Sequence, residues 1–401
     1  MTDSALPPPS DEIEESLPLS VRKRVRPRAR KNPAPSDVPP EGTLRRVFVR
    51  MRQSRLAMVG LVAIASLALV SIFADLLASE LPIVCRVHGT TYVLPAVTQP
   101  DALAGWDIAR IEAERAPGDW AIRPLVPCGP RQTGANGELA LLRAPAFERA
   151  HPLGTDAYGR DVFARLVHGA RTSMSVALFA VAAFVTIGTA LGALAGFFGG
   201  NLDALISRLI ETLTAFPTLI LVLVVQATVA HPTTLTLLAT LALTRWTEVA
   251  RLVRAEVLLV ASQDYVMAAR ALGAGPWRIL RKHVAPNARA PVLVSVTFGI
   301  ASVVLIEAAL DFLRVGLPAP IASWGEMLSQ SRDHLSAWWL LVFPGLCVFM
   351  SVVALNLVGE ALRDALDPRL HAAVGGGGAG GADTPQVLAP SSTAFDGTRH
   401  A

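Results

Sequence analysis

The chain has 401 residues, of which 52% are hydrophobic and only 17% are charged, a balance more apolar than that of soluble globular proteins. Its 36 basic residues comprise 33 Arg and three Lys, and no Lys follows a Gly. This excludes the G-x-x-x-x-G-K-[ST] phosphate-binding loop, so the chain is not a P-loop ATPase. The three cysteines lack the C-x-x-C spacing of zinc and redox sites, so the sequence gives no support for a metal site.

The first and last parts of the chain have compositions typical of disorder. Residues 1–43 are rich in Pro and contain a basic run at 20–31, while residues 372–401 begin with a Gly-rich stretch. Between the first tail and the first apolar stretch, Leu44, Val47, Phe48 and Met51 recur at helical spacing opposite several Arg. Residues 44–78 are therefore expected to form an interfacial helix followed by a first span.

Long uncharged stretches predict six membrane-spanning helices, because about 20 apolar helical residues are needed to cross ~30 Å of hydrocarbon. A turn is expected at His231-Pro232, and the helix that begins near Thr233 continues into charged residues at 245, 248 and 251. The other five predicted spans cover residues 56–74, 172–202, 212–230, 290–306 and 335–359. We expect an all-α polytopic membrane protein.

The distribution of Arg and Lys predicts the orientation, because basic loops stay on the cytoplasmic side. Twelve of the 36 basic residues precede the first span and eight lie in residues 245–289, whereas residues 312–336 hold only Arg314 and Arg332. Both termini and the 245–289 segment are thus expected in the cytoplasm. Residues 79–150 then form an exported insert between spans 1 and 2.

The insert contains Cys85 and Cys128, on the oxidising side by this topology. We expect them to form a disulfide, with two free thiols as the alternative. Cys347 lies inside a predicted span and is expected to be a free, packed thiol.

The sequence carries no recognisable catalytic constellation, and few ionisable residues lie inside the predicted spans. The sequence has no G-x-S-x-G or H-E-x-x-H pattern, and a basic tail without interleaved aromatics does not favour nucleic-acid binding. Glu307, Asp311 and Arg314 follow one helical face, with Trp324 just beyond. They are candidates for an outer gate, or alternatively for a local structural ion pair.

The cytoplasmic segment 259–287 is expected to hold two short helices. Asp264 is the expected N-cap of the first, which ends at Gly273, and a second cationic turn follows before Pro286. The small residues Ala268 and Ala269 suit a ridge that fits a groove on another protein.

These residues carry a resemblance to a known family. Met267-Ala268-Ala269-x-x-x-Gly273 followed by His283-Val-Ala-Pro286 resembles the EAA loop of ABC-importer permeases. Three further stretches resemble the C-type permease of dipeptide and oligopeptide importers. They are His151-Pro-Leu-Gly-Thr-Asp156-x-x-Gly159-Arg160-Asp161, Ser323-Trp324-Gly325-Glu-Met-Leu328 and Arg363-Asp-Ala-Leu-Asp-Pro368.

The resemblance implies a six-span permease in the bacterial inner membrane, with its core at residues 151–371. Its partners would be a second, homologous permease, two ATP-binding subunits that carry ATP-Mg, and an external solute-binding protein. The chain itself would hold no cofactor and catalyse no reaction. Met267 departs from the family, which has Glu there, and the long insert is more like the microcin C and long-oligopeptide subgroup. The alternative is a six-span ion-coupled carrier or channel.

Overall fold

The computed structural model describes residue 49 and residues 51–133, 141–146 and 151–366. The two predicted disordered tails, residues 1–43 and 372–401, lie outside these residues, as do residues 44–48 of the predicted interfacial helix. Parts of the predicted insert, residues 134–140 and 147–150, are also outside them. The account below therefore concerns the helical region and most of the insert.

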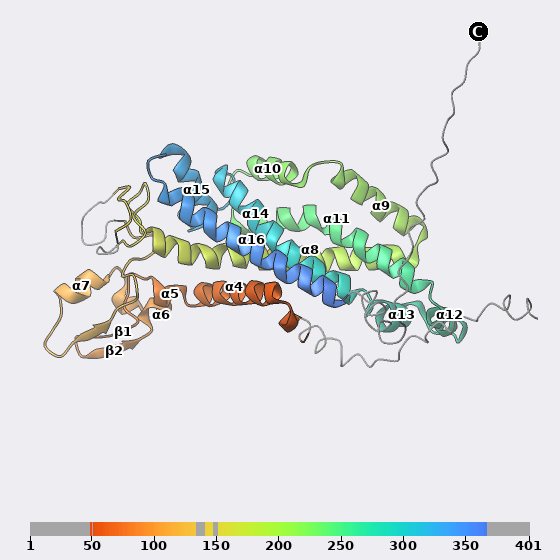
Figure 1. Cartoon of the computed structure of the whole chain (residues 1–401), viewed down its shortest axis with the longest axis horizontal. Coiled ribbons are helices and arrows are strands. Elements are labelled where there is room, and N and C mark those ends of the chain that lie inside the picture. Colours follow the sequence, from red (N-terminus) through yellow and green to blue (C-terminus); the bar gives the residue numbers. More distant parts are fainter. Residues whose placement is uncertain (1–48, 50, 134–140, 147–150, 367–401) are drawn as a thin grey trace, which may run out of the picture. The chain divides into compact units, whose positions relative to one another are not determined.

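Helices dominate the described part of the chain (Figure 1). Among the described residues, four helices are long and apolar enough to cross a membrane, or up to five if a bent pair counts as one span. The four are α4 (Arg55–Ile72), α8 (Val162–Phe198), α14 (Arg289–Phe312) and α16 (Trp339–Leu366). The helix α11 (Thr234–Ala261) has 28 residues but carries several charges in its second half. The architecture is that of a helical, multi-span membrane protein.

The predicted single helix over residues 212–230 was wrong. In its place α9 (Gly200–Thr214) and α10 (Thr218–Thr228) meet at an 83° bend. The break lies at Pro217, which has no N–H to continue the helix and which disfavours helical geometry at Phe216 before it. The turn expected at His231-Pro232 is confirmed, since it separates α10 from α11.

Side-chain caps explain where several helices begin. Asp161 accepts a 2.7 Å hydrogen bond from the backbone N of Ala164, so α8 starts ten residues before the uncharged stretch that predicted it. The cap satisfies an N–H that would otherwise lack a partner in the first turn. Thr233 and Thr236 form a reciprocal capping box at the start of α11.

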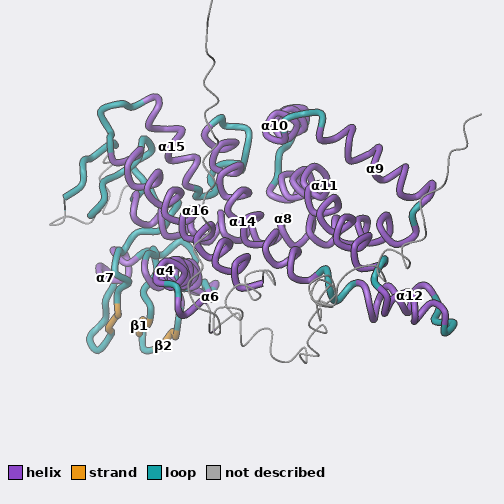
Figure 2. The backbone as a smooth tube through the Cα atoms, turned by 45° about the vertical axis from the view of Figure 1, so that its right-hand side comes forward, coloured by secondary structure: helices purple, strands orange, loops and turns teal. Residues whose placement is uncertain are grey.

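Three glycines at intervals of four residues bring α8 against the backbone of α11. A methyl group on Gly188 would lie 2.6 Å from the carbonyl oxygen of Trp246, and one on Gly196 would lie 2.8 Å from that of Arg254. On Gly192, between them, it would overlap the backbone of Ala250. Small residues at this spacing allow close packing of membrane helices, and α8 and α11 lie side by side in Figures 1 and 2.

The remaining long helices pack around this pair. α14 contacts α8 and α16, and α4 contacts α16 and α8. Arg171 of α8 holds the end of α4, because its guanidinium donates to the carbonyl oxygens of Ser71 (2.8 Å) and Ile72 (3.1 Å) and pairs with Asp75 (2.8 Å). Unpaired carbonyls at a helix C-terminus favour such a cation.

The insert is a small mixed unit at the N-terminal end of α8, and its short strands are an addition to the helical fold that the sequence predicted. The described part has three antiparallel strands in the order β2-β1-β3: β1 (Val84–Val87), β2 (Thr90–Val93) and β3 (Trp120–Ile122). Short helices complete it: α6 (Pro95–Thr98), η2 (Asp101–Leu103) and α7 (Ile108–Ala113). The short helix α5 (Ala74–Leu77) lies between α4 and the insert. The backbone N of Val126 donates to the Leu77 oxygen at 2.9 Å, which ties the insert to α5.

Candidate functional site

Two short helices follow α11 where the sequence predicted the protein-docking segment. They are α12 (Asp264–Ala271) and α13 (Pro276–Ile279), and α13 continues into the π-helical turn η4 (Leu280–Val284). The N-cap of α12 is Gln263, which makes no side-chain cap bond. The expected capping role of Asp264 was therefore wrong, because the helix begins one residue earlier and places this acid in the first turn.

The predicted stop at Gly273 is confirmed. Gly273 has φ of +80°, its N–H donates to the oxygen of Arg270, and the N–H of Ala274 donates to that of Ala269. These two bonds form a Schellman motif, in which a residue of left-handed conformation satisfies the last carbonyls of the helix. A side chain at Gly273 would meet no atom within 4 Å, so its requirement for glycine is one of backbone conformation.

The α12–α13 segment exposes apolar side chains. Leu272 is 88% exposed, and Tyr265, Met267 and Trp277 are also exposed. Ala268 is exposed and Ala269 half-buried, while Val266, Ile279 and Val284 point into the core. Asn287, just after the half-buried Pro286, donates to the Tyr265 hydroxyl and so ties the far end of the segment to α12. One face of the segment packs on the core, and the opposite face is exposed.

The candidate gate residues Glu307 and Asp311 are both buried in α14. Ser173 of α8 donates a 3.0 Å hydrogen bond to Glu307. Asp311 accepts hydrogen bonds from the Ser323 hydroxyl and from the backbone N of Leu317. The two carboxyl groups thus connect α14 to α8 and to the turn that precedes the next helix, α15 (Trp324–Asp333).

The other two candidate gate residues, Arg314 and Trp324, have different partners. Arg314 adopts φ of +61° directly after α14 and pairs with Asp333 at the end of α15. The ion pair expected with Asp311 was wrong, because a left-handed residue leaves the helical face on which the expectation depended. Trp324 is fully buried, and its indole N–H donates to the oxygen of Leu166 at 3.0 Å. Trp324 is therefore an anchor of α15 on α8.

Sequence reasoning missed a buried charge network between the start of α8 and α15. Arg165, with 0% of its side chain exposed, donates to Glu326 at 2.5 Å and to the carbonyl oxygen of Pro130 at 3.0 Å. Arg160 binds Asp156 at 2.6 Å and Glu326 at 3.1 Å. Asp156, Arg160 and Glu326 lie within the stretches that carried the family resemblance, but spacing alone did not indicate that they meet.

Gln330 completes this network. Its side-chain amide donates to Glu326 at 2.7 Å, and its carbonyl oxygen accepts from the backbone N of Ala157 at 3.0 Å. Buried charges need such partners, because an unpaired one costs several kcal/mol. We call Asp156, Arg160, Arg165, Glu326 and Gln330 the α8–α15 network.

The two insert cysteines are free in the structure, so the expected disulfide is not formed there. Cys85 on β1 packs with Leu81 and Leu103, whereas Cys128 packs in a separate cluster with Ala78 and Val126. The two side chains thus belong to different parts of the core. Burial, and after it the charge of Asp161, raises the pKa of Cys128 to about 12. Cys347 is also a free thiol, as predicted.

The long apolar helices are those of a multi-span membrane protein, and the α12–α13 segment gives it an exposed apolar surface beyond α11. Residues 188–372 match the family described as binding-protein-dependent transport system inner membrane component. Residues 42–84 match the N-terminal TM domain of oligopeptide transport permease C. The protein class is therefore a transport permease.

Individual relatives narrow this class. The chain is 34% identical over 345 residues to a dipeptide transport system permease protein of Alkalihalophilus pseudofirmus, covering 84% of this chain and 96% of the relative. It is 41% identical to a di/tripeptide transport system permease protein of Pseudomonas aeruginosa (54% and 72% covered). It is 38% identical to an oligopeptide transport system permease protein of Bacillus subtilis (55% and 72% covered). The chain belongs to this permease family of ABC importers and is a transport component rather than an enzyme.

Proposed function

We propose that the chain is one of two permease subunits of a bacterial inner-membrane importer for peptides or peptide-like solutes. The relatives are named for dipeptides, di/tripeptides and oligopeptides, and this class of solute is the one that the chain would carry. The observation that carries the proposal is the match of 96% of a dipeptide permease by 84% of this chain. A solute-binding protein outside and two ATP-binding subunits inside complete the importer.

The proposed topology has six spans with both termini in the cytoplasm and the insert outside. α11 supplies the sixth span and the bent pair α9–α10 another. Support comes from the eight basic residues in 245–289, which favour a cytoplasmic position for the α12–α13 segment. The insert contacts the N-terminal end of α8, as in the hydrogen bond of Arg165 to Pro130, whereas α12 follows the C-terminal end of α11. The two segments thus lie at different ends of the α8–α11 pair.

Impermeant thiol reagents applied to intact spheroplasts test this topology. Leu125→Cys in the insert and Leu272→Cys after α12 introduce thiols at positions that are 72% and 88% exposed. We expect Leu125→Cys to react in intact cells and Leu272→Cys only after permeabilisation. The unsubstituted chain is the control for the native cysteines. The opposite labelling pattern would refute the orientation.

The α12–α13 segment is the proposed docking surface for an ATP-binding subunit. Its exposed apolar side chains Met267, Leu272 and Trp277 can be buried in a groove of a partner, which is the main source of affinity in such contacts. ATP-Mg would bind to that partner and not to this chain. Met267 stands where the family motif has Glu. The proposed docking surface therefore has an apolar side chain at a position where the motif has a charged one.

The translocation path would lie between the two permeases. Glu307 and Asp311 are buried within this single chain, a position that favours holding α15 against α14 and α8 over lining a path between chains. We therefore assign them a structural role at the outer end of α14 and take the gate role as the alternative.

Transport itself is tested by reconstitution. The chain, its homologous permease, the ATP-binding subunits and the solute-binding protein are assembled in vesicles and supplied with labelled dipeptides and longer peptides. We expect uptake that requires both ATP and the binding protein. Uptake that persists without ATP and follows an ion gradient would instead support the carrier alternative, which the relatives do not favour.

A further inference from the structure

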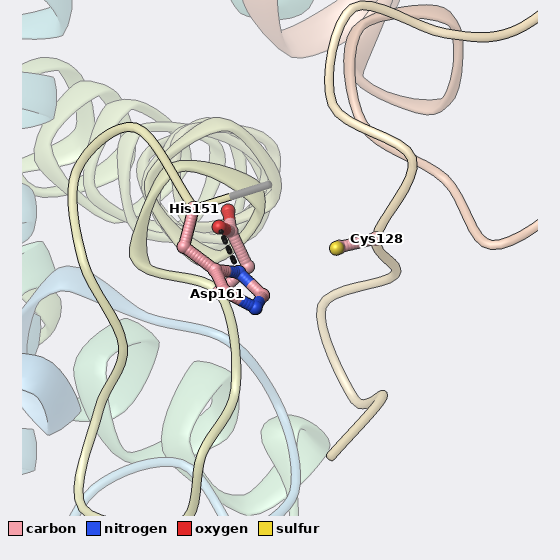
Figure 3. A group of neighbouring side chains, drawn as sticks. All are labelled: Cys128, His151 and Asp161. Atoms are coloured by element: carbon pink, nitrogen blue, oxygen red, sulfur yellow. Dashed lines mark hydrogen bonds and ion pairs between the residues drawn. The ribbon is translucent and has the colours of Figure 1, made fainter. Parts of the chain in front are cut away.

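Three side chains from separate segments meet beside the N-terminus of α8 (Figure 3). Cys128 comes from the insert, His151 from the loop that leads to α8, and Asp161 is the N-cap of that helix. One donor atom from each lies within 4.8 Å of the others, and all three residues are buried. Sulfur, imidazole nitrogen and carboxylate oxygen thus converge in the interior.

The group is held in place by bonds outside itself. One oxygen of Asp161 accepts from the backbone N of Ala164 at 2.7 Å, and the other lies 2.8 Å from Nδ1 of His151. The loop after His151 is closed by a hydrogen bond from the backbone N of Gly154 to the oxygen of His151. Cys128 packs against Ala164 in the first turn of α8. Such fixed positions lower the ordering cost of binding a ligand.

We propose that Cys128, His151 and Asp161 form a binding site for a thiophilic divalent cation, with Zn²⁺ as the metal that these donors fit best. Thiolate, imidazole and carboxylate are the ligands that Zn²⁺ takes in proteins, at about 2.0–2.3 Å, usually in a tetrahedron. In that geometry the donors lie roughly 3.3–3.7 Å apart. To bind the ion, the three donor atoms would move slightly closer together, and the 2.8 Å distance between His151 and Asp161 would lengthen. A water molecule would take the fourth position.

Charge balance supports this assignment. A thiolate and a carboxylate neutralise one divalent cation, so the occupied site brings no net charge into a buried position. Thiol, imidazole and carboxylate also occur together in nucleophilic sites. Here the Cys128 side chain is only 1% exposed, so no substrate reaches the sulfur, whereas a metal ion needs no such access once bound.

The site would join two parts of the chain. Cys128 belongs to the insert, while His151 lies in the loop before α8 and Asp161 is the N-cap of α8, both within the permease core. A bound cation would therefore cross-link the insert to α8, next to the hydrogen bond between Arg165 and the oxygen of Pro130. This is a stabilising role, separate from the transport function proposed above.

Metal analysis of the full chain in detergent tests the proposal. After a chelator wash, the chain is incubated with Zn²⁺ or Co²⁺, desalted and analysed for metal. We expect one equivalent in the wild type and in the control Cys85→Ser, and at least about tenfold weaker binding in Cys128→Ser and His151→Gln. Co²⁺ should give a thiolate-to-metal charge-transfer band that disappears with Cys128→Ser.

A second readout uses the wild-type chain and needs no substitution of a packed side chain. In the wild type, Zn²⁺ but not Mg²⁺ should protect Cys128 from slow alkylation, as measured by peptide mass spectrometry, while Cys347 reacts equally with either ion. Retention of metal by Cys128→Ser at the wild-type level would indicate an adventitious ion only. That result, the absence of stoichiometric metal in the wild type, or the absence of protection would each overturn the proposal.

Discussion

Arg165 and Glu326 are 161 positions apart in the sequence and form a 2.5 Å ion pair in which the arginine is fully buried. Arg165 lies in the first turns of α8 and Glu326 in the first turn of α15, so one contact fixes the two helices to each other. The pair is the centre of the α8–α15 network, and removing Arg165 would take one partner each from Glu326 and from the carbonyl oxygen of Pro130.

We predict that Arg165→Met lowers the thermal stability of the purified chain strongly. The substitution removes the ion pair with Glu326, which is 24% exposed and keeps Arg160 and Gln330, and it leaves the carbonyl oxygen of Pro130 without the hydrogen bond from Arg165. Hydrogen bonds to charged groups contribute about 1.5–3 kcal/mol, so a loss of this size is expected. The matched control is Arg208→Met, whose pair with Glu211 is exposed at 81% and 67% and should contribute little. Equal melting temperatures for the two variants would contradict the prediction.

We predict that Gly192→Ala destabilises the chain by about 1–3 kcal/mol, because a methyl group there overlaps the backbone of Ala250 and forces α8 and α11 apart. Gly345→Ala in α16 is the control, since its nearest contact would be Leu328 at 3.8 Å. Thermal unfolding in detergent measures both. If both alanines are tolerated, the helices are not held at the distance that the structure gives.

We predict that Gly273→Val separates ATP hydrolysis from uptake. A β-branched residue with φ of +80° is strained by about 1–3 kcal/mol, so the end of α12 must change its backbone. The control is Gly275→Ala, which has φ of −63° and equally open surroundings. Uptake per ATP hydrolysed in reconstituted vesicles is the readout, and unchanged coupling in Gly273→Val would exclude this position from the docking surface.

We predict that Glu307→Gln assembles normally and keeps the ATPase activity that the binding protein stimulates. The amide oxygen can still accept the hydrogen bond of Ser173. Glu307→Ala, by contrast, leaves Ser173 without this partner and should cost about 1–3 kcal/mol. Normal assembly combined with loss of stimulation in Glu307→Gln would favour the gate role instead.

We predict that the insert loses stability in acid through Asp119. Burial acts to raise the pKa of Asp119, but hydrogen bonds from the backbone N–H groups of His88, Ala116 and Gly89 hold it below its ordinary value. A lowered folded pKa gives stability that is present above the unfolded pKa of about 3.9 and is lost as pH falls through the folded pKa.

Limited proteolysis of the insert as a function of pH measures this loss. The wild type should become sensitive in that acidic range, and Asp119→Asn should be sensitive already at neutral pH. Asp101→Asn, at an exposed acid of the same insert, serves as the control. An unchanged cleavage profile in Asp119→Asn would show that the carboxylate does not hold the turn.

The apolar stretches and the stop at Gly273 could be predicted because each follows from local chemistry: continuous hydrophobic sequence and a helix end that needs a left-handed residue. The prediction of one helix over 212–230 failed because it depended only on the absence of charged residues. Pro217 was not considered, although the proline ring breaks the helix there. Attention to every Pro within an apolar stretch would have given the bend between α9 and α10.

The contacts that join α8, α14, α15 and the insert could not be predicted in this way. Arg314 pairs with Asp333 because the backbone turns left-handed after α14, and helical spacing extends only as far as the helix does. Arg165, Glu326 and Pro130 meet only after the long helices have packed. Likewise, the separation of Cys85 from Cys128 depends on two hydrophobic clusters that a single sequence does not distinguish.

The close contact of Gly188, Gly192 and Gly196 with α11 restricts how α8 and α11 can move relative to each other. With 37 residues at about 1.5 Å each, α8 is roughly 55 Å long, and along its second half it touches the backbone of α11 with no flexible side chains in between. Such a contact leaves little room for one helix to slide or rotate against the other. A displacement of α12, which follows α11 after only two residues, would therefore move α8 and α11 together, including the N-terminal end of α8 where the α8–α15 network lies.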